Sequence, residues 1–182
     1  MTIYIVRHTK PKIEMGICYG QTDLDVGDSF DQEITSLQKY VFNYSDYKCI
    51  SSPLQRCTKL ALALGFSEYQ TEPLIQEIDF GEWELQPWDN ISRDKLDKWA
   101  DNLQTFRFPK GESFLDLKVR VSSFIDSLDF EKDNILIISH AGVIRVFFHI
   151  LCEMELAKVL SIKISYGDIF EVQKNQIHKI SL

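Results

Sequence analysis

The sequence predicts an α/β protein: a three-layer α/β/α sandwich in which helices cover both faces of a mostly parallel sheet. Two short runs, residues 3–6 and 135–138, are apolar throughout and contain neither Gly nor Pro. Unbroken apolarity over so few residues is typical of strands buried on both faces, as in a parallel sheet between helices. Strand-like runs alternate with segments that carry apolar residues at helical spacing, and this alternation favours the layered fold.

Length and composition are those of an ordinary globular protein. We expect one domain over residues 1–182, because 182 residues with 45% hydrophobic and 26% charged content suffice for one sizeable core. The net charge of −7 and the absence of a basic run disfavour a nucleic-acid partner. No secretion signal and no apolar stretch of membrane-spanning length is visible, so we expect no membrane partner and a cytoplasmic location. The sequence makes no prediction of the oligomeric state.

The four cysteines, at positions 18, 49, 57 and 152, show no Cys-x-x-Cys spacing. This scatter disfavours a zinc or redox motif and indicates reduced thiols.

The expected strands are short apolar runs that are bounded by turn-forming residues. Besides the two buried runs, the sequence indicates a second strand and an edge strand in the N-terminal half. Three strand-like runs follow near the C-terminus, and a turn at Lys174 and Asn175 joins the last two. The expected strands cover residues 3–6, 47–51, 69–72, 135–139, 161–166, 168–173 and 176–181.

The expected helices begin and end at recognisable capping residues. Asp28 or Ser29 caps the first helix, and Ser52 caps the second, with Pro53 at its first position. Gly65 closes the second helix. Two segments rich in Gly and Pro or in acidic and aromatic residues are expected to be loops, residues 8–27 and 76–90. The helices are expected at residues 28–41, 52–64, 92–102, 114–128 and 143–152.

Cationic and imidazole side chains follow the predicted strands. Arg7 and His8 follow the first strand, Arg56 lies in the first turn after the second, and His140 follows the strand that ends at Ser139. Functional groups of open α/β sheets gather at strand ends, so neighbouring strands would bring these four side chains together. Two guanidiniums, two imidazoles and a helix N-terminus form a site for a tetrahedral oxyanion such as phosphate.

Two alternatives remain open for these residues. Each of them, taken singly, also fits a structural role, such as a surface ion pair for an arginine or a capping position for a histidine. His8 and His140 together also allow metal binding, although neither has a carboxylate at ligand spacing in the sequence.

Three stretches contain these residues, Arg7-His8 and residues 51–56 and 139–143, and a fourth stretch, residues 77–84, is acidic and aromatic. Together the four stretches resemble the signature of the histidine phosphatase superfamily, which includes the cofactor-dependent phosphoglycerate mutases. The resemblance implies a phosphoglycerate mutase-like fold and no metal or cofactor, because guanidiniums occupy the usual place of magnesium. It further implies that His8 is the phosphorylated nucleophile, that Arg7, Arg56 and His140 bind the phosphoryl group, and that Glu77 is the acid. Asp79, Glu82 and Glu84 are rival acids in the same stretch.

Within the superfamily, residues 18–24 and 111–113 look most like the α-ribazole phosphatase branch. That branch removes the 5′-phosphate of α-ribazole phosphate in cobalamin nucleotide-loop assembly. In this chain Tyr19, together with Trp83 or Trp88, is expected to offer an aromatic face to a heteroaromatic ring of the substrate.

Three positions depart from the usual pattern. Thr9 stands where the family usually has Gly, Glu14 where Asn is often found, and Leu85 where Gly usually follows Trp-Glu. One phosphate donor is then missing, or it is supplied by Gln21 or Thr22.

The expected function is hydrolysis of a small-molecule phosphate ester through a phosphohistidine. A phosphomutase or a broad-specificity phosphatase is an alternative, and so is a non-catalytic phosphate-binding module. The predicted loops are short and offer little material for a lid that keeps water from the phosphohistidine, which weighs against a mutase. The intact set of candidate residues weighs against the non-catalytic module.

Overall fold

The structure is a computed structural model that describes residues 2–40, 47–130, 134–173 and 175–180. Within these residues a six-stranded sheet has the order β3-β2-β4-β1-β5-β6. The first four of these strands are parallel to one another. At the other edge β5 is antiparallel to both of its neighbours, β1 and β6. This arrangement confirms the mostly parallel sheet. The strands are β1 (Ile3–Arg7), β2 (Lys48–Ser51), β3 (Gln70–Thr71), β4 (Ile135–Ser139), β5 (Ile169–Gln173) and β6 (Gln176–Lys179).

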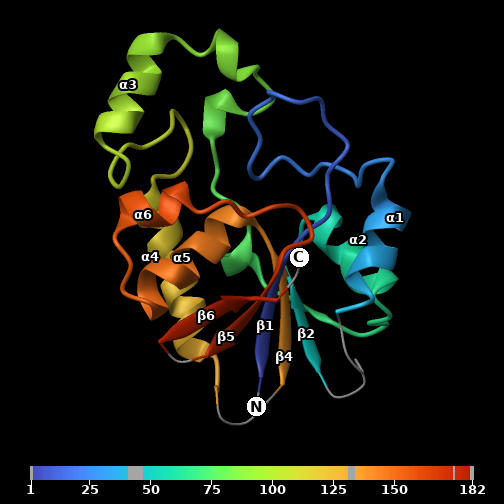
Figure 1. Ribbon diagram of the computed structural model, residues 1–182. Helices are drawn as coiled ribbons and strands as arrows, with labels where there is room; N and C mark the ends of the chain where they lie inside the picture. The colour runs from blue at the N-terminus through green and yellow to red at the C-terminus, as the bar shows by residue number, and fades with distance from the viewer. Residues whose placement is uncertain (1, 41–46, 131–133, 174, 181–182) are drawn as a thin grey trace.

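Helices cover both faces of the sheet, as Figure 1 shows. The first two helices lie on one face, while α4 and α5 pack on the other with α6 beside them. Helix α3 lies beyond the carboxyl ends of the parallel strands. The three-layer α/β/α fold is therefore confirmed. The helices are α1 (Phe30–Leu37), α2 (Gln55–Ala63), α3 (Arg93–Asp101), α4 (Phe114–Ser127), α5 (Ala141–Leu151) and α6 (Leu156–Ser161).

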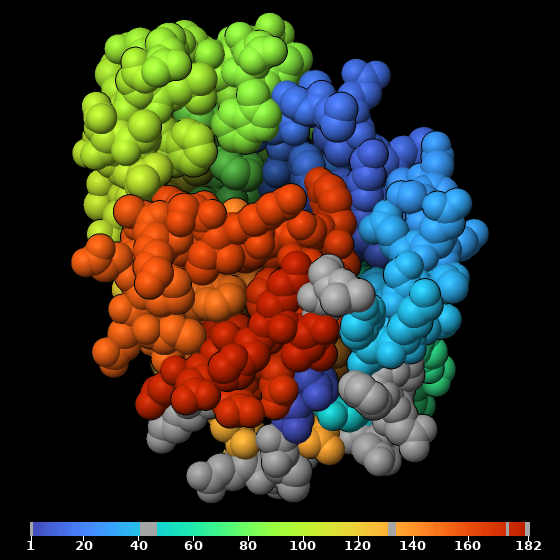
Figure 2. All heavy atoms as spheres, viewed as in Figure 1, coloured from blue at the N-terminus to red at the C-terminus, as the bar shows by residue number. Residues whose placement is uncertain are grey.

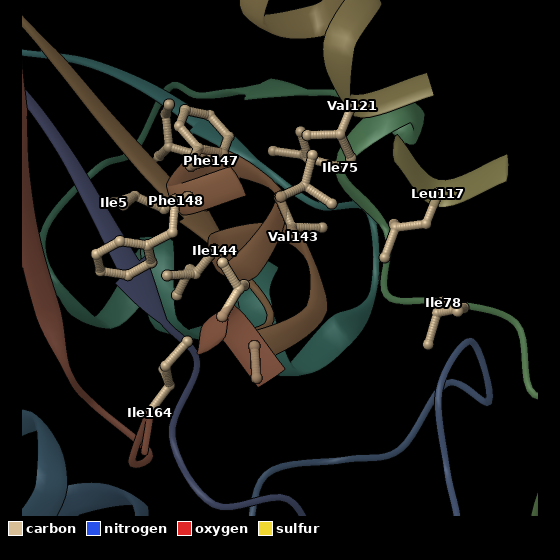
Figure 3. Close-up of a cluster of buried hydrophobic side chains, with 14 of the residues drawn as sticks. Ile5, Ile75, Ile78, Leu117, Val121, Val143, Ile144, Phe147, Phe148 and Ile164 are labelled. Atoms are coloured by element: carbon tan, nitrogen blue, oxygen red, sulfur yellow. The ribbon is translucent and has the colours of Figure 1, made fainter. Parts of the chain in front are cut away.

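The central strands contribute to a hydrophobic core on each face, because successive side chains of a strand point to opposite faces. Ile5 of β1 and Ile137 of β4 belong to the cluster that contains α4 and α5, whereas Val6 and Ile138 belong to the cluster of α1 and α2. Burial on both faces explains why the two runs are apolar without interruption. Figure 3 shows part of the larger cluster, with labels on Ile5, Ile75, Ile78, Leu117, Val121, Val143, Ile144, Phe147, Phe148 and Ile164.

Helix α2 begins later than the capping pattern predicts. Ser52 is not its N-cap: Leu54 is, in an extended conformation with ψ 134°, and the helix starts at Gln55. The capping hydrogen bond comes from another segment, since Asp23 Oδ1 accepts the backbone N–H of Gln55 at 2.7 Å. The extended Leu54 leaves Ser52 and Pro53 outside the helix, and the Ser52 hydroxyl accepts the backbone N–H of Leu54 at 3.4 Å.

The C-terminal segment contains a second difference. Residues 161–166 do not form the expected strand: α6 runs through Ser161, and the backbone of the following residues does not pair with the sheet. Two carbonyl groups of this segment accept hydrogen bonds from arginines instead. Ile162 O accepts from Arg145 Nη2 at 3.3 Å, and Ile164 O accepts from Arg7 Nη1 at 2.5 Å. Gly167, with φ +74°, then turns the chain into β5.

The remaining elements follow the sequence closely. The edge strand, the helices near residues 92–102 and 114–128, and the two last strands are present, although α5 begins at Ala141 rather than at Val143. Gly65 ends α2 with φ +96°, as expected for a helix-closing glycine. Val41, expected in the first helix, and Lys174, expected in the last turn, lie outside the described residues. Asn175 beside it has φ +69°, which suits a tight turn.

Candidate active site

The parallel pairing of β1 with β4 brings the two candidate histidines together. Arg7 lies opposite Ser139 in the register, so the next residue of each strand, His8 and His140, leaves the sheet at the same edge. The backbone N–H of His8 donates to Ser139 O at 3.0 Å. The ring centroids of the two histidines lie 5.0 Å apart in an edge-to-face arrangement. The juxtaposition predicted from strand ends alone is therefore present.

His8 is buried, and its hydrogen bonds define its protonation. Its Nδ1 lies 2.6 Å from the carbonyl oxygen of Thr9, which can only accept, so Nδ1 carries the hydrogen. Nε2 then holds the lone pair. Burial first, and then the positive charges of Arg56 and Arg7, hold the pKa of His8 well below its usual value of 6.5. The imidazole is therefore neutral at pH 7.

His140 is held in the complementary tautomer. The guanidinium of Arg56 can only donate, so Nδ1 of His140 accepts from Arg56 Nη2 at 3.3 Å. Nε2 consequently carries the hydrogen and donates to Ser52 Oγ at 2.8 Å. Burial, Arg56 and then His8 hold the pKa of His140 well below 6.5. Both imidazoles are thus neutral in the folded protein.

The two arginines are fixed from behind by backbone carbonyls. Arg56 is fully buried and donates to Thr22 O at 2.8 Å and to Gly20 O at 2.6 Å. Arg7 donates to Ile164 O, and its guanidinium carbon lies 3.9 Å from the ring centroid of Tyr166. A guanidinium has five N–H donors, and these contacts use only part of them. The Nε atoms of both arginines are buried without a hydrogen-bond partner in the described part of the chain.

Glu77 lies at the N-terminus of α5. Its Oε2 accepts the backbone N–H of Gly142 at 3.1 Å, and its Oε1 accepts that of Ile78 at 2.9 Å. A side chain at position 142 would collide with this carboxylate, because a Cβ there would lie 2.1 Å from Oε1. The stretch 139–143 therefore has a glycine at position 142 because the Glu77 carboxylate occupies the space that a side chain would need.

The three rival acids have other partners. Asp79 Oδ1 accepts the N–H of Gly81 at 2.7 Å, and Glu82 pairs with Lys110 at 2.8 Å on the surface. Glu84 accepts the N–H groups of Gln21 and Thr22 at 2.8 and 2.6 Å and the hydroxyl of Thr22. Of the four carboxylates, Glu77 is the one that lines the cavity next to Arg7.

Two neighbouring cavities lie beside Glu77. The first, about 670 Å³, is lined by Arg7, Tyr19, Glu77, Ala141 and Tyr166 among others. The second, about 340 Å³, lies beneath α3 and is lined mainly by apolar and aromatic side chains. The lining residues that both cavities share are Glu77, Phe80, Trp88 and Arg145.

Tyr19 and Trp88 lie where the sequence places them, and Trp83 does not. Tyr19 lines the first cavity, and its hydroxyl is 2.7 Å from that of Tyr166. Trp83 is only 2% exposed and lies within an aromatic cluster, with its centroid 4.9 Å from that of Phe108. The expectation that Trp83 offers a face to the substrate is corrected by this burial, while the alternative, Trp88, lines both cavities.

The backbone N–H groups of Gln21 and Thr22 and the hydroxyl of Thr22 donate to the carboxylate of Glu84. These bonds hold the loop, and the loop contributes two carbonyl groups, of Gly20 and Thr22, to Arg56. The phosphate-binding role expected of Gln21 and Thr22 stays a prediction.

The three departures from the family pattern are accommodated differently. Thr9 is fully buried, and its hydroxyl has no partner among the described residues. Glu14 lines the wall of the first cavity. Leu85 has φ +63°, the left-handed region that favours glycine, which explains why Gly is usual there and predicts a strain of about 1–2 kcal/mol.

A supporting ion pair behind Glu77 was not predicted. Arg120 of α4 pairs with Glu112 at 2.8 Å and donates to Glu77 O at 2.8 Å. It also donates to Leu74 O and Gln76 O, so one guanidinium holds the backbone that leads to Glu77. A sequence signal existed, because Arg120 stands three residues after a core residue, Leu117, on an otherwise apolar helix face.

The described residues contain no group of three or more His, Cys, Asp or Glu side chains placed to hold a metal ion. Among the helices of the described residues, none has the length and apolarity that a membrane crossing requires.

A mostly parallel sheet with helices on both faces defines an α/β protein, and at one edge of this sheet lie two neutral histidines, the buried Arg56, the partly buried Arg7 and the N-terminus of α5. The chain belongs to the histidine phosphatase superfamily (branch 1), whose family model matches residues 3–178. The resemblance predicted from the four motifs is confirmed.

Two named relatives are similar over most of this chain. A protein of Hydrogenobacter thermophilus named putative phosphoserine phosphatase 2 is 26% identical over 179 residues, which cover 93% of this chain and 88% of that protein. Human 6-phosphofructo-2-kinase/fructose-2,6-bisphosphatase 4 is 30% identical over 79% of this chain. The match spans only 31% of the length of that human protein.

Solved structures share the fold at lower identity. A phosphoglycerate mutase from Thermus thermophilus has a TM-score of 0.81 at 23% identity and covers 100% of this chain and 99% of that chain. A putative α-ribazole-5′-P phosphatase from Escherichia coli has a TM-score of 0.82 at 21% identity and covers 100% of this chain and 95% of that chain. At these identities the likeness concerns the fold, which is phosphoglycerate mutase-like.

Proposed function

We propose that this chain is a phosphomonoesterase that hydrolyses a small-molecule phosphate ester through a phosphohistidine on His8. The observation that carries the proposal is the hydrogen bond from His8 Nδ1–H to Thr9 O, 2.6 Å long, which leaves the lone pair on Nε2. The lowered pKa of His8 keeps this nitrogen unprotonated at pH 7, as a nucleophile requires.

The phosphoryl group of the substrate binds between the arginines. Its peripheral oxygens carry the charge during transfer, so fixed cations beside them supply most of the acceleration. Arg56 and Arg7 are both anchored by backbone carbonyls, and His140 is fixed by Ser52. Because the guanidinium groups of Arg7 and Arg56 are already positioned, little reorganisation of these donors accompanies binding.

The reaction proceeds in two displacements. In the first, Nε2 of His8 forms a bond to phosphorus while the bond from phosphorus to the leaving oxygen breaks, and Glu77 gives its proton to that oxygen. In the second, a water oxygen attacks phosphorus, the P–N bond breaks, and the water proton returns to Glu77. Inorganic phosphate and the alcohol are the products, and both His8 and Glu77 return to their starting states.

As the finer substrate proposal, we favour a nucleotide-like monophosphate, with α-ribazole 5′-phosphate as the leading choice. Tyr19 and Trp88 in the cavity wall support it, because each offers a flat face for a heteroaromatic ring. Its kcat/KM is expected to exceed that for simple sugar phosphates by at least about a hundredfold, roughly 3 kcal/mol. Equal values would leave a broad-specificity phosphatase instead.

The experiment that tests the proposal traps the covalent intermediate. The protein is mixed with radiolabelled p-nitrophenyl phosphate and quenched in alkali, in which phosphohistidine survives. The wild type is expected to retain label, His8→Ala to retain none and to turn over less than about a hundredth as fast as the wild type. His178→Ala, at an exposed position of β6, is the matched control and should behave as the wild type. Label retained in His8→Ala would remove His8 from the role of nucleophile.

A further inference from the structure

The second cavity continues the first beyond Glu77. Its walls come from Trp99 of α3, Phe114 and Leu117 of α4, and Leu160 of α6, with Leu103 between α3 and α4. In Figure 1 the chain around α3 lies beyond α6, and Figure 2 shows the same segment, coloured green to yellow, resting against the orange residues of the C-terminal half. The cavity volume of about 340 Å³ falls within the range of small-molecule sites.

The lining of this cavity differs in chemistry from that of the first. Its charged side chains, Glu77 and Arg145, are both shared with the first cavity and therefore mark the junction between the two. Beyond the junction the walls are aromatic or aliphatic. The rings of Trp88 and Trp99 lie nearly parallel there, with centroids 5.9 Å apart and an interplanar angle of 17°.

A wall of this kind selects against polar groups inside the second cavity. A hydroxyl or a charged amino group there would lose its hydrogen bonds to water and find no partner in exchange, so the polar part of an alcohol, such as the ribose of a nucleotide-like substrate, would stay in the first cavity. An apolar ring would instead be removed from water against other apolar atoms. The position of Glu77 in both linings also places a carboxylate where the first cavity, which Arg7 lines, adjoins the apolar one.

We propose that the second cavity is the leaving-group site of the enzyme and that the substrate class is a phosphate monoester whose alcohol carries an apolar ring. The phosphate binds in the first cavity, the ester oxygen lies beside Glu77, and the ring enters the space between Leu103, Phe114 and Leu160. This inference rests on the proposed hydrolysis for its catalytic meaning, and it deepens that proposal by naming what the cavity accepts.

The test compares two alkyl esters with similar leaving oxygens, 3-phenylpropyl phosphate and propyl phosphate. Because they differ mainly in the ring, the cavity should raise kcat/KM for the phenyl ester at least about tenfold over the propyl ester, which corresponds to about 1.4 kcal/mol. Leu103→Trp fills the cavity and should lower kcat/KM for the phenyl ester at least about tenfold more than for the propyl ester. Leu160→Phe, a smaller change in α6, provides the same comparison should Leu103→Trp fail to fold. Leu62→Trp, at a position of α2 that is 55% exposed, is the control and should leave the ratio unchanged.

A binding measurement separates this inference from the proposed activity. Calorimetric titration of 3-phenylpropylphosphonate and propylphosphonate reports on the cavity without turnover. A ring preference in binding, reduced in Leu103→Trp, without hydrolysis of any ester would overturn the proposed activity and support the cavity assignment. Hydrolysis of both esters with equal kcat/KM, and equal affinity for both phosphonates, would overturn the inference while the phosphatase stands.

Discussion

The strand-end centre and the cap above it are built on different principles. The strand-end centre comprises Arg7, His8, Arg56 and His140, and its geometry follows from the register of two parallel strands and the start of α2. The cap comprises residues 9–27 and 77–111, and most of its residues lie outside helices and strands. It is held by carboxylates that accept backbone N–H groups, above all Glu84. The first region places the groups for chemistry, and the second determines what can reach them.

The comparison predicts that changes in the strand-end centre affect every ester equally. Arg56→Lys keeps the charge but loses the planar fork that bonds to Gly20 O and Thr22 O. We expect kcat/KM to fall at least about a hundredfold for aryl and alkyl phosphates alike, the usual loss when a transition-state donor is removed. Arg93→Lys, at an exposed position of α3, is the control and should change nothing. A loss confined to one class of ester would mean that Arg56 acts on the leaving group instead.

Changes at Glu77 should depend on the ester, because an acid matters most when the leaving group is poor. Glu77→Gln is expected to slow hydrolysis of alkyl phosphates about a hundredfold and of p-nitrophenyl phosphate much less. Glu82→Gln and Asp79→Asn are matched controls, since their carboxylates bond to Lys110 and to the N–H of Gly81. Leaving-group dependence at Glu82 rather than at Glu77 would show that the acid has been misassigned.

Gly142→Ala tests the contact between the Glu77 carboxylate and the N-terminus of α5. The new methyl group would meet Glu77 Oε1 at 2.1 Å, so the carboxylate must move away from the N-terminus of α5. We expect about a tenfold lower kcat/KM for alkyl phosphates and almost no change for p-nitrophenyl phosphate. The free energy of unfolding should be measured alongside, and an equal loss for both esters would indicate a general distortion of α5.

The smallest expected effect is on stability as a function of pH. In the folded protein the pKa values of His8 and His140 are below 6.5, so below that pH the unfolded chain binds more protons than the folded one. The stability is therefore fully present above about pH 7 and falls as the pH drops from there, by up to about 1.4 kcal/mol per unit for each histidine. Urea denaturation between pH 7.5 and 5 should show this slope, and His8→Gln should reduce it. An unchanged slope in that variant would contradict a neutral, buried His8.

The sequence predicts the strand-end centre well because its cause is local. Unbroken apolar runs define β1 and β4, and the parallel register then places the residue that follows each strand. The cap is a different matter. Nothing in the sequence around Trp83 shows that the ring of Trp83 is enclosed by Phe106, Phe108 and Trp99, since those residues lie more than fifteen positions away.

Side-chain to backbone bonds over long distances in the chain explain the other misses. The start of α2 depends on Asp23, which lies on a loop 32 residues earlier. The predicted strand at 161–166 fails because two of its carbonyl groups bond to Arg7 and Arg145 rather than to a neighbouring strand. Such partners have no periodicity, so pattern analysis of the sequence does not detect them.

The placement of β1 in the sheet has a consequence for biosynthesis. The two neighbours of this strand both come much later in the chain: β4 begins at residue 135 and β5 at residue 169. A nascent chain therefore leaves both edges of β1 unpaired until residue 135 and the residues after it have been synthesised. Pairings over such long stretches of sequence form slowly, and unpaired strand edges favour association with other chains. Arg7 and His8 are synthesised with β1, but the support for Arg7 from Ile164 comes 157 residues later in the chain, and that from Tyr166 comes later still.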